Sequence, residues 1–515
     1  MHNTNHDISN SNTLNFDVYS SDKEKALSTI IVNRNDSLQQ KEENKRLQEQ
    51  VSELETENKE LRKELQELKE KLAKLSKTSK NSSKPPSSDL VKQNQKKDKE
   101  KKHKIGGQPG HSKHERIPFT QDEVHNVHEY NLDQCPVCQH SVEIDLGKEP
   151  KIIQQAEILE IPIQIEEHRA YAYWCAHCQK YHYPEFPPEV IKAGLFKARM
   201  TALVAYMKNV CHCSFSNIRK YIRDVLHLKV SRGYLCKIIQ KVSNSLEGPY
   251  EELLTLLPLA SKVNIDETGH KENGEKFWTW VFKTDLYVLF KIDKSRSSAV
   301  LIEVLGKEFN GVLGCDYFSA YRKYMNDFNI TVQFCIAHLI RDIKYLTSLP
   351  DIEIKEYGEK LLSYLRDLFR IIHEKPDFPD NDFIDRLTQA KDQIILTAIH
   401  QAPSLINENG KEEKTEAQRI AKRFINHGKA YFEFITTPDI EPTNNIAEQA
   451  IRFVVIDRHV TQGTRSIKGR KANERLWTVI ATCSLQGKSA FEFILKAVQA
   501  YFKNHSVPSL IFDTS

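Results

Sequence analysis

A heptad repeat from Asn44 to Leu75 constrains this chain more than any other feature of its sequence. Its a positions hold Asn44, Val51, Asn58, Leu65 and Leu72, and its d positions hold Leu47, Leu54, Leu61, Leu68 and Leu75. Leucine at d with Asn or a β-branched residue at a favours a parallel two-stranded coil, in which a buried Asn58 pair fixes the register. The repeat therefore predicts a coiled coil at residues 36–78 that forms a homodimer. The alternatives are a helix packed on its own domain and a solvated single helix.

Polar segments flank the repeat. Residues 1–35, rich in Asn, Ser and Asp without periodicity, predict a disordered tail. Residues 79–116 predict a flexible basic linker, because Pro85 and Pro86 forbid helix. From Lys74 to Lys104 the chain carries eleven lysines against three acidic residues. Such lysines gain affinity for DNA by releasing counterions, although a merely solubilising linker has the same composition.

Residues 117–190 contain two Cys-x-x-Cys pairs, formed by Cys135, Cys138, Cys175 and Cys178. This spacing lets four thiolates close around one structural Zn²⁺, which would fold a domain with little core of its own. A strand-like stretch from Ile152 to Ile165 separates the pairs. His177 lies inside the second pair and is interpreted as a surface residue, because four cysteines already satisfy the metal.

Composition limits the class of protein. A chain of 515 residues with 39% apolar content is long enough for several domains, each with its own core. Ten cysteines, in a chain that opens with a polar run, indicate a reducing, cytoplasmic location. The longest apolar runs fall far short of the ~18 to 20 residues that span a bilayer, so no membrane role is expected.

Residues 191–255 predict a helical region with helices at Ala198–Val210, Phe215–Leu226 and Ser231–Leu246. Ser231 is a suitable cap for the third helix. If the trio is a helix-turn-helix, Arg232, Tyr234 and Lys237 meet the major groove. Three short helices that simply pack together are the alternative.

Residues 256–346 alternate between strand and helix patterns. The expected strands are Lys262–Asp266, Phe277–Phe282, Leu286–Ile292, Val312–Cys315 and Thr331–Phe334, and the expected helices are Ser298–Leu305 and Ala337–Leu346. The second and third strands predict an antiparallel hairpin. Asp266 is expected to end the first strand, on the face opposite Val263 and Ile265, and Asp316 follows the fourth.

Residues 347–435 predict an all-helical insertion, because their leucines keep helical spacing and no strand pattern interrupts them. A helix is then expected within Glu441–Val455, opened by Pro442. Its buried stripe is Ile446, Ala447, Ala450, Ile451 and Val454. Asn444 and Asn445 lie one turn before Glu448, and Arg452 lies one turn after it, so these residues share a face. Residues 436–515 would complete a multidomain α+β fold.

Asp266, Asp316 and Glu448 are the candidate metal ligands. Two strands and a late helix would deliver three hard oxygen ligands for two Mg²⁺ or Mn²⁺ ions, which in two-metal sites lie about 3.5 to 4 Å apart. The spacing by itself is weak evidence. The chain has 70 acidic residues, and each member of the triple can equally be a cap or a surface charge.

Several motifs together make the sequence resemble the insertion sequence 66 family of bacterial DDE transposases. They are Ser82–Asp89 (SSKPPSSD), Gly106–His111 (GGQPGH), the paired cysteine knuckles, Asp266–Gly269 (DETG), Cys315–Tyr317 (CDY), Cys335–His338 (CIAH) and Asn444–Arg452 (NNIAEQAIR). The resemblance implies an RNase H-like catalytic core, interrupted by the helical insertion before its last carboxylate. It also implies that Asp266, Asp316 and Glu448 form the metal-binding triad.

The resemblance places Cys335 and His338 close to the active site; a buried cysteine and a capped histidine are the alternative. Glu267, the nearest competitor of Asp266, would point to the other side of its strand. Gln449 stands where many relatives have Arg, and Tyr317 stands where Gly is frequent.

The implied function is metal-dependent cleavage of DNA at insertion-sequence ends and strand transfer into target DNA, in the bacterial cytoplasm at the nucleoid. The implied partners are duplex DNA, a second copy of the chain and accessory proteins of the same element. Arg465, Lys468, Arg470 and Lys471 are expected to hold phosphates, with a solvated loop as the alternative. The alternative functions are a non-catalytic dimeric zinc DNA-binding regulator and an RNase H-like nuclease that does not join DNA.

Overall fold

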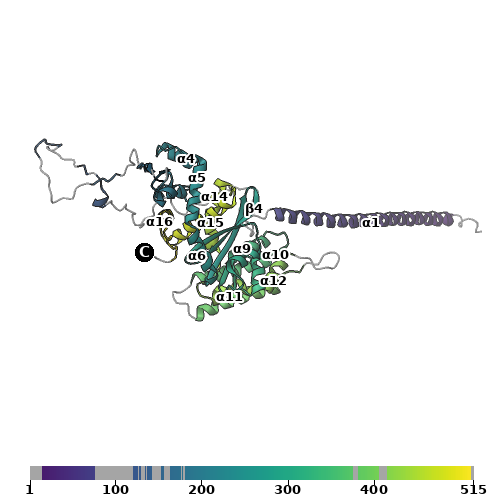
Figure 1. The fold of residues 1–515 in the computed structure, drawn as a ribbon. Helices are drawn as coiled ribbons and strands as arrows, with labels where there is room; N and C mark the ends of the chain where they lie inside the picture. Colours follow the sequence, from purple (N-terminus) through teal and green to yellow (C-terminus); the bar gives the residue numbers. More distant parts are fainter. Residues whose placement is uncertain are drawn as a thin grey trace, which may run out of the picture. The chain divides into compact units, whose positions relative to one another are not determined.

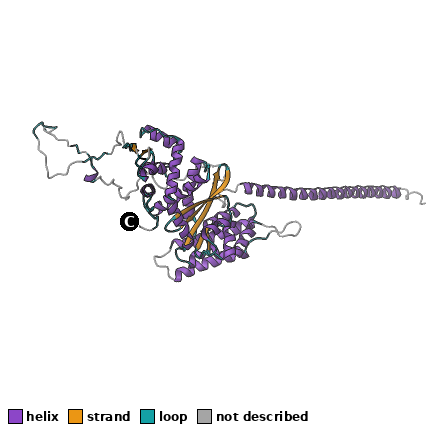
Figure 2. Cartoon of the chain, viewed as in Figure 1, coloured by secondary structure: helices purple, strands orange, loops and turns teal. Residues whose placement is uncertain are grey.

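The computed structural model describes residues 14–75, 120–125, 127–128, 134, 136–141, 152–155, 163–175, 177, 180–374, 381–404 and 415–511. It is a mixed α+β structure, mostly helical with one mixed sheet (Figures 1 and 2). The chain divides into two compact units. One comprises residues 1–89 and 336–436, and the other comprises residues 90–335 and 437–515. No described helix is both long and apolar enough to span a membrane.

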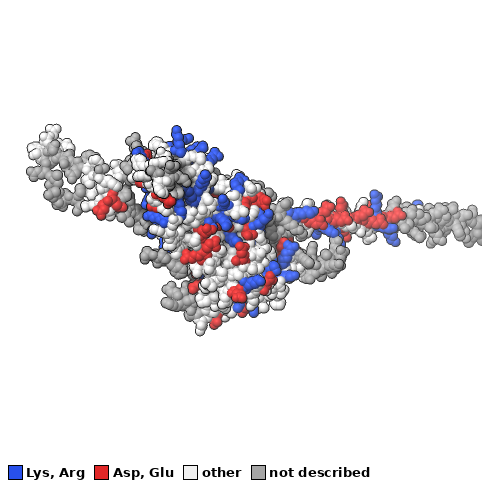
Figure 3. Space-filling view, in the orientation of Figure 1, with Lys and Arg blue, Asp and Glu red and all other residues white. Residues whose placement is uncertain are grey.

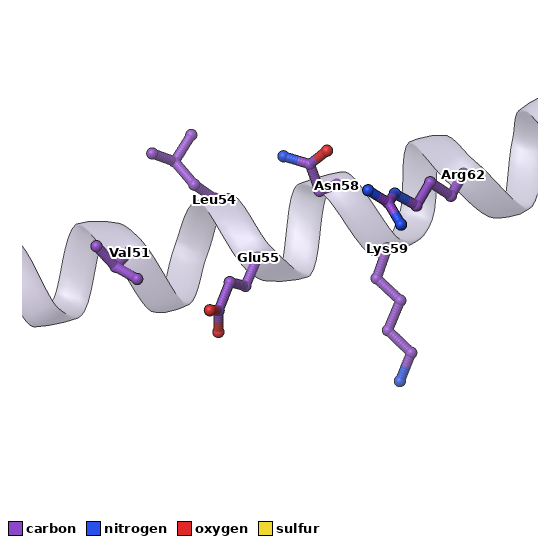
Figure 4. A pocket seen from close by; sticks show the side chains of 6 residues that line it. All are labelled: Val51, Leu54, Glu55, Asn58, Lys59 and Arg62. Carbon is purple, nitrogen blue, oxygen red and sulfur yellow. The ribbon is translucent and has the colours of Figure 1, made fainter.

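The heptad repeat lies on a single helix, α1 (Leu14–Leu75). Its described leucines are more than half exposed, from 51% at Leu47 to 68% at Leu72. In Figure 4, Leu54 and Asn58 project to one side of this helix, while Glu55 and Lys59 project to the other. A largely apolar stripe on one exposed helix, interrupted by Asn44 and Asn58, is what the coiled-coil prediction requires of each strand.

The prediction of a disordered tail at residues 1–35 is wrong from Leu14 onward, where the helix has already begun. Adding a residue to an existing helix orders one residue for one new hydrogen bond, which is far less costly than nucleating a new helix. The segment also contains Ala26, Leu27, Ile30 and Ile31, which are compatible with helix. The basic linker at residues 79–116 lies outside the described residues.

Residues 336–436 form helices throughout their described part, without a strand. They are α9 (Ile336–Leu346), α10 (Ile352–His373), α11 (Asn381–His400), α12 (Glu416–His427), η4 (Gly428–Tyr431) and α13 (Glu433–Thr436). Leu361, Leu365 and Leu368 of α10 are fully or almost fully buried. The hydroxyl of Tyr357 donates to the carbonyl of Ala398 at 2.8 Å, which joins α10 to α11. The predicted helical character of residues 347–435 is confirmed for these elements.

The sheet of the second unit has five strands in the order β5-β4-β3-β6-β7. Their bounds are β3 (Lys262–Glu272), β4 (Glu275–Lys283), β5 (Val288–Asp293), β6 (Val312–Cys315) and β7 (Val332–Phe334). β4 runs antiparallel to β3 and β5, whereas β6 runs parallel to β3 and β7. The central strand β3 is therefore paired on both edges.

β3 is six residues longer than predicted, so Asp266 does not end it. Its pairing with β4 continues to Glu272 opposite Glu275. Asn273 and Gly274, both with positive φ, make the connecting turn. The sequence from Glu267 to Glu272 is too polar to show strand alternation, and the hydrogen bonds to β4 order it instead. The pairing with β6, in contrast, stops at Asn264 opposite Gly314.

A helix that lies late in the sequence covers the edge strand β5. From α15 (Ile467–Leu485), Glu474, Thr478 and Thr482 present side-chain oxygens at successive turns. These oxygens accept hydrogen bonds from the backbone amides of Ile292 at 2.6 Å, Phe290 at 2.9 Å and Val288 at 3.1 Å. The unpaired edge of the sheet is thereby satisfied, which prevents pairing with another chain.

This unit contains further helices. They are α2 (Pro188–Ala193), α3 (Ala198–Asn209), α4 (Phe215–Asp224), α5 (Arg232–Ser245), α6 (Glu247–Leu256), η3 (Leu257–Leu259), α7 (Ser298–Leu305), α8 (Ser319–Phe328), α14 (Asn445–Thr461) and α16 (Ala490–Lys503). The predicted helical trio corresponds to α3, α4 and α5. The cap prediction is also confirmed, because the Ser231 hydroxyl accepts from the amide of Tyr234 at 3.1 Å.

The described part of the predicted zinc domain is small. It comprises η2 (Gln121–Glu123), the antiparallel pair β1 (Tyr173–Cys175) and β2 (Lys180–His182), and an isolated bridge between Gln134 and Ser141. The described residues between Ile152 and Ile165 form no strand, so that prediction is wrong for them. Ile152, Ile153 and Ile165 are exposed, and none of these described residues takes part in a strand or bridge.

The contact between α15 and the sheet edge generates a stability prediction. Thr478→Val keeps the shape of the side chain but leaves the buried amide of Phe290 without its acceptor. We expect a loss of about 1 to 3 kcal/mol in the free energy of unfolding, measured by urea denaturation. Amide hydrogen exchange at Phe290 should accelerate as well. The control is Thr255→Val, whose exposed hydroxyl bonds only within its own helix, and which should change neither measurement. Equal effects of the two substitutions would contradict the assignment.

Candidate active site

Asp266 is presented by the central strand where β3 passes beyond the end of β6. The last parallel pair of these strands is Asn264 with Gly314, two residues before Asp266. One carboxylate oxygen of Asp266 accepts from the amide of Glu267 at 2.9 Å. β6 ends at Cys315, so Asp316 follows directly, and its carboxylate accepts from the amide of Phe318 at 2.9 Å. The neighbouring parallel strands thus place both aspartates at the same edge.

Glu448 is presented by the first turn of α14. This helix begins at Asn445, after Asn444, and not at Pro442 as predicted. The reason is that the side chain of Asn444 is held by the sheet. Its amide nitrogen donates to the carbonyl of Ile265 at 2.7 Å, and its oxygen accepts from the side chain of Asn264 at 2.9 Å. These contacts dock the start of α14 on β3.

Gly314 leaves room for this docking. A Cβ atom at Gly314 would lie 2.3 Å from the side-chain nitrogen of Asn264, far inside contact distance. The side chains of Asn264 and Asn444 are almost fully buried. The sequence patterns did not single out Asn264 or Gly314. A buried polar residue in an otherwise apolar strand was the signal available for Asn264, because such a group needs a partner.

The other two predicted ligands act electrostatically on Asp266. Burial raises the pKa of Asp266 well above its ordinary value, and the carboxylates of Glu267, Asp316 and Glu448 raise it further. Carboxylates that oppose one another's ionisation form a set that a divalent cation would stabilise. The donor set therefore fits hard metal ions that prefer oxygen ligands.

Glu267, the neighbour of Asp266, has partners of its own. Arg296 donates to its carboxylate at 2.7 Å, and the hydroxyl of Tyr321 donates to the other oxygen. Burial, followed by the charge of Asp316, raises the pKa of Glu267 to about 7. Arg296 lies between the rings of Trp278 and Phe318, 4.3 and 4.0 Å from their centroids. Glu267 thus belongs to a packed ion pair with Arg296.

Cys335 lies beside the start of α14. It is buried, and its sulfur accepts from the backbone amide of Asn444 at 3.2 Å. Its sulfur also lies within 4.8 Å of a carboxylate oxygen of Glu448. His338 is the third residue of α9, the helix that begins directly after Cys335.

The predicted DNA-binding residues differ in availability. Arg232, Lys237, Arg465, Lys468 and Lys471 are exposed, and so are Asn445 and Arg452, which were predicted to lie near the site. Arg470 instead lies 3.7 Å from the carboxylate of Glu272 and over the ring of Phe277. The predicted loop is only partly a loop, since α15 begins at Ile467 after its cap Ser466. Tyr234 is also not available to a groove, because its hydroxyl accepts from the amide of Phe196 at 3.1 Å.

The predicted zinc ligands lie mostly outside the described residues. Cys135 and Cys178 lie outside the described residues, as does the side chain of Cys175, and Cys138 is exposed. The backbone pairings on either side of these cysteines are described. The Gln134–Ser141 bridge encloses the first pair, and the Cys175–Lys180 pairing encloses the turn of the second.

Comparisons with known proteins give a family match. The model of the Transposase IS66 family matches residues 193–472, more than half of the 515 residues, and a family of unknown function (DUF6444) matches residues 35–117. No curated protein matches. A solved structure, the simian T-cell lymphotropic virus intasome in complex with the PP2A regulatory subunit B56 gamma, is similar at 15% identity, covering 42% of this chain and 74% of that chain. Its TM-score of 0.14 is too low to compare the folds.

The raised pKa of Asp266 generates a prediction about stability and pH. Because the folded chain holds this proton more tightly than the unfolded chain, Asp266 costs stability once the pH exceeds its ordinary value of 3.8, and the cost grows towards the folded pKa. Asp266→Asn removes the cost. With metals chelated, the gain in thermal midpoint over wild type should therefore be larger at pH 8 than at pH 5. The exposed Asp327→Asn on α8 is the control and should show no such trend. A pH-independent difference for Asp266→Asn would contradict the electrostatic account.

Proposed function

Because this chain belongs to the IS66 transposase family, we propose that it cuts DNA at the ends of an insertion sequence and joins them to target DNA, using Asp266, Asp316 and Glu448. The observation that carries the proposal is the convergence of these carboxylates: Asp266 lies on β3, Asp316 directly follows the neighbouring parallel strand β6, and the charges of Asp316 and Glu448 both raise the pKa of Asp266. The three carboxylates are contributed by β3, by the residue after β6 and by α14, which are far apart in the sequence. The stability of the sheet does not require acidic residues at these three positions, and the repulsion between their carboxylates opposes folding.

The three carboxylates would hold two Mg²⁺ or Mn²⁺ ions, and bound ions of this kind lower the pKa of the attacking nucleophile and neutralise charge on the transition state. The residues of the chain itself orient and shield the site. Asn444 fixes the first turn of α14, which carries Glu448. Arg296 satisfies Glu267, which keeps a fourth carboxylate from competing at the site.

The sheet supports an RNase H-like core. Its central first strand pairs with an antiparallel hairpin partner on one side and with parallel strands on the other. Residues 336–436 would be the helical insertion that separates this part from the last carboxylate. Cys335, together with the His338 that follows it in the Cys-x-x-His motif, is proposed to flank the site, and Arg452, Arg465, Lys468 and Lys471 to hold DNA phosphates near it.

The heptad stripe supports a parallel homodimer. Glu57 and Glu64 occupy g positions, and Arg62 and Lys69 occupy e positions of the following heptads. In a parallel pair in register, each of these acids would face a base on the second copy, and the two Asn58 residues would meet. A dimer brings two active sites to the two ends that must be cut and joined. Cys135, Cys138, Cys175 and Cys178 would hold one structural Zn²⁺.

Strand transfer in vitro tests the activity. The purified chain, Mg²⁺ or Mn²⁺ and DNA carrying the ends that flank its own gene should give joined products. Asp266→Ala and Glu448→Ala should each reduce the products below detection, because each removes a metal ligand. Asp327→Ala on α8 is the acidic control and should retain activity. Tight binding without cleavage by wild type would favour a DNA-binding regulator, and cleavage without joining would favour a nuclease.

The dimer has a separate test. Leu54→Asp combined with Leu61→Asp places charges in two d layers and should convert the full-length protein from dimer to monomer in light scattering after size exclusion. Ser52→Asp combined with Thr56→Asp adds the same charge outside the a and d positions and should leave the dimer intact. A dimer that survives the leucine substitutions would refute the coiled-coil interface.

A further inference from the structure

The segment from Lys208 to Lys241 is the most basic part of the helical trio. Its cations are Lys208, Arg219, Lys220, Arg223, Lys229, Arg232, Lys237 and Lys241. Asp224 is the one acid among them, whereas the whole chain carries a net charge of only +4. Figure 3 shows blue side chains gathered where Figure 1 places α4 and α5. The charge is concentrated on a small part of one unit.

Two of these cations serve the fold. Lys208 lies 3.9 Å from the buried carboxylate of Asp457. The ammonium group of Lys241 donates to the carbonyls of Lys192 and Ala193 at 2.7 and 2.9 Å. The remaining six are exposed. These six cations therefore form a charged surface that is not needed for the packing of the unit.

α4 carries half of this surface. Ile218 and Ile222 anchor its inner face and are fully or almost fully buried. Arg219 and Arg223, one turn apart, lie on the outer side with Lys220 next to them. Like charges at this spacing repel and weaken a helix. Asp224 pairs with Arg223, so a single acid offsets three cations.

α5 packs beside α4, and its start is held in place. The ring of Tyr234 meets that of Phe196 at 5.4 Å between centroids, and Ser231 caps the helix. Arg232 and Lys237 remain exposed on this rigid start. A fixed helix start beside a second, basic helix is the arrangement in which one helix faces a groove and the other crosses the DNA backbone.

We propose that α4 is a phosphate-contacting helix, in which Arg219, Lys220 and Arg223 bind the backbone of the duplex that the start of α5 faces. The inference rests on the proposed function, since it names where the DNA is held. Contacts of this kind position DNA without reading its sequence. α4 should therefore contribute equally to binding of element ends and of unrelated duplexes.

The test uses the full-length protein without added Mg²⁺ or Mn²⁺, so that the DNA is not cut. The dissociation constant is measured over a series of salt concentrations for a duplex containing the element end and for a scrambled duplex of the same length. For Arg219→Ala/Lys220→Ala/Arg223→Ala we expect weaker binding to both, by about tenfold or more near 0.1 M salt. The slope of log affinity against log salt should become shallower by about 2 to 3. The reason is that binding releases fewer counterions from the DNA when fewer cations contact its phosphates.

The matched control is Lys360→Ala/Arg366→Ala/Arg370→Ala on α10, which removes the same exposed charge, including one cation that pairs with a neighbouring acid. It should bind DNA like wild type, and the thermal midpoints of both variants should match wild type. An unchanged slope for the α4 variant would overturn the proposal, as would loss of preference for the element end with unchanged affinity for the scrambled duplex. An equal loss of affinity in the α10 variant would also overturn it.

The outcomes separate this inference from the proposed function. If wild type binds DNA but never cuts it under activating conditions, the proposed function fails, and the slope of the α4 variant still decides the present inference. If wild type cuts DNA and the α4 variant binds like wild type, the inference alone fails. A wild type that binds a different polyanion but no duplex DNA would overturn both.

Discussion

The hydrogen bond between the buried side chains of Asn264 and Asn444 is the contact on which the proposed active site depends. It joins a central strand to the start of a helix 180 residues later in the chain. The side chain of Asn444 also donates to the carbonyl of Ile265, and its backbone amide donates to the sulfur of Cys335. Each polar group buried at this junction thus has a partner, which makes a displaced helix start costly. The position of Glu448, one turn further on, follows from this docking.

The acids at this junction work against the stability of the fold. Asp266 carries a raised pKa because burial and three neighbouring carboxylates oppose its ionisation. The next residue, Glu267, is accommodated by Arg296 and Tyr321, whose hydrogen bonds compensate part of the cost of burial. Asp266 and Glu267, although neighbours in the sequence, differ in how their charge is compensated. One acid is satisfied by the protein, and the other forms part of a set whose natural complement is a cation.

The sheet that carries the site is completed by chain that follows the helical segment 336–436. α14 packs on β3 and β4, where Ala447, Ile451 and Val454 join the core with Trp477. α15 places Glu474, Thr478 and Thr482 along the edge of β5. Strands near the middle of the chain therefore depend on its end for both their core and their edge. Truncation before α14 would expose apolar surface and unpaired backbone together.

The sequence by itself determined the elements whose periodicity reports a buried face. The heptad stripe, the three helices at 198–245 and the helix Ser298–Leu305 all have this signal, and the motifs selected Asp266, Asp316 and Glu448. Only the tertiary structure decided the length of β3, whose polar residues after Asp266 are ordered by β4, and the start of α14, which the sheet moves to Asn445. It also gave partners within the fold to Tyr234 and Arg470, two residues that the sequence had placed at the DNA. The physical reason is that periodicity is a local property, whereas a hydrogen bond across 180 residues leaves no local trace in either segment.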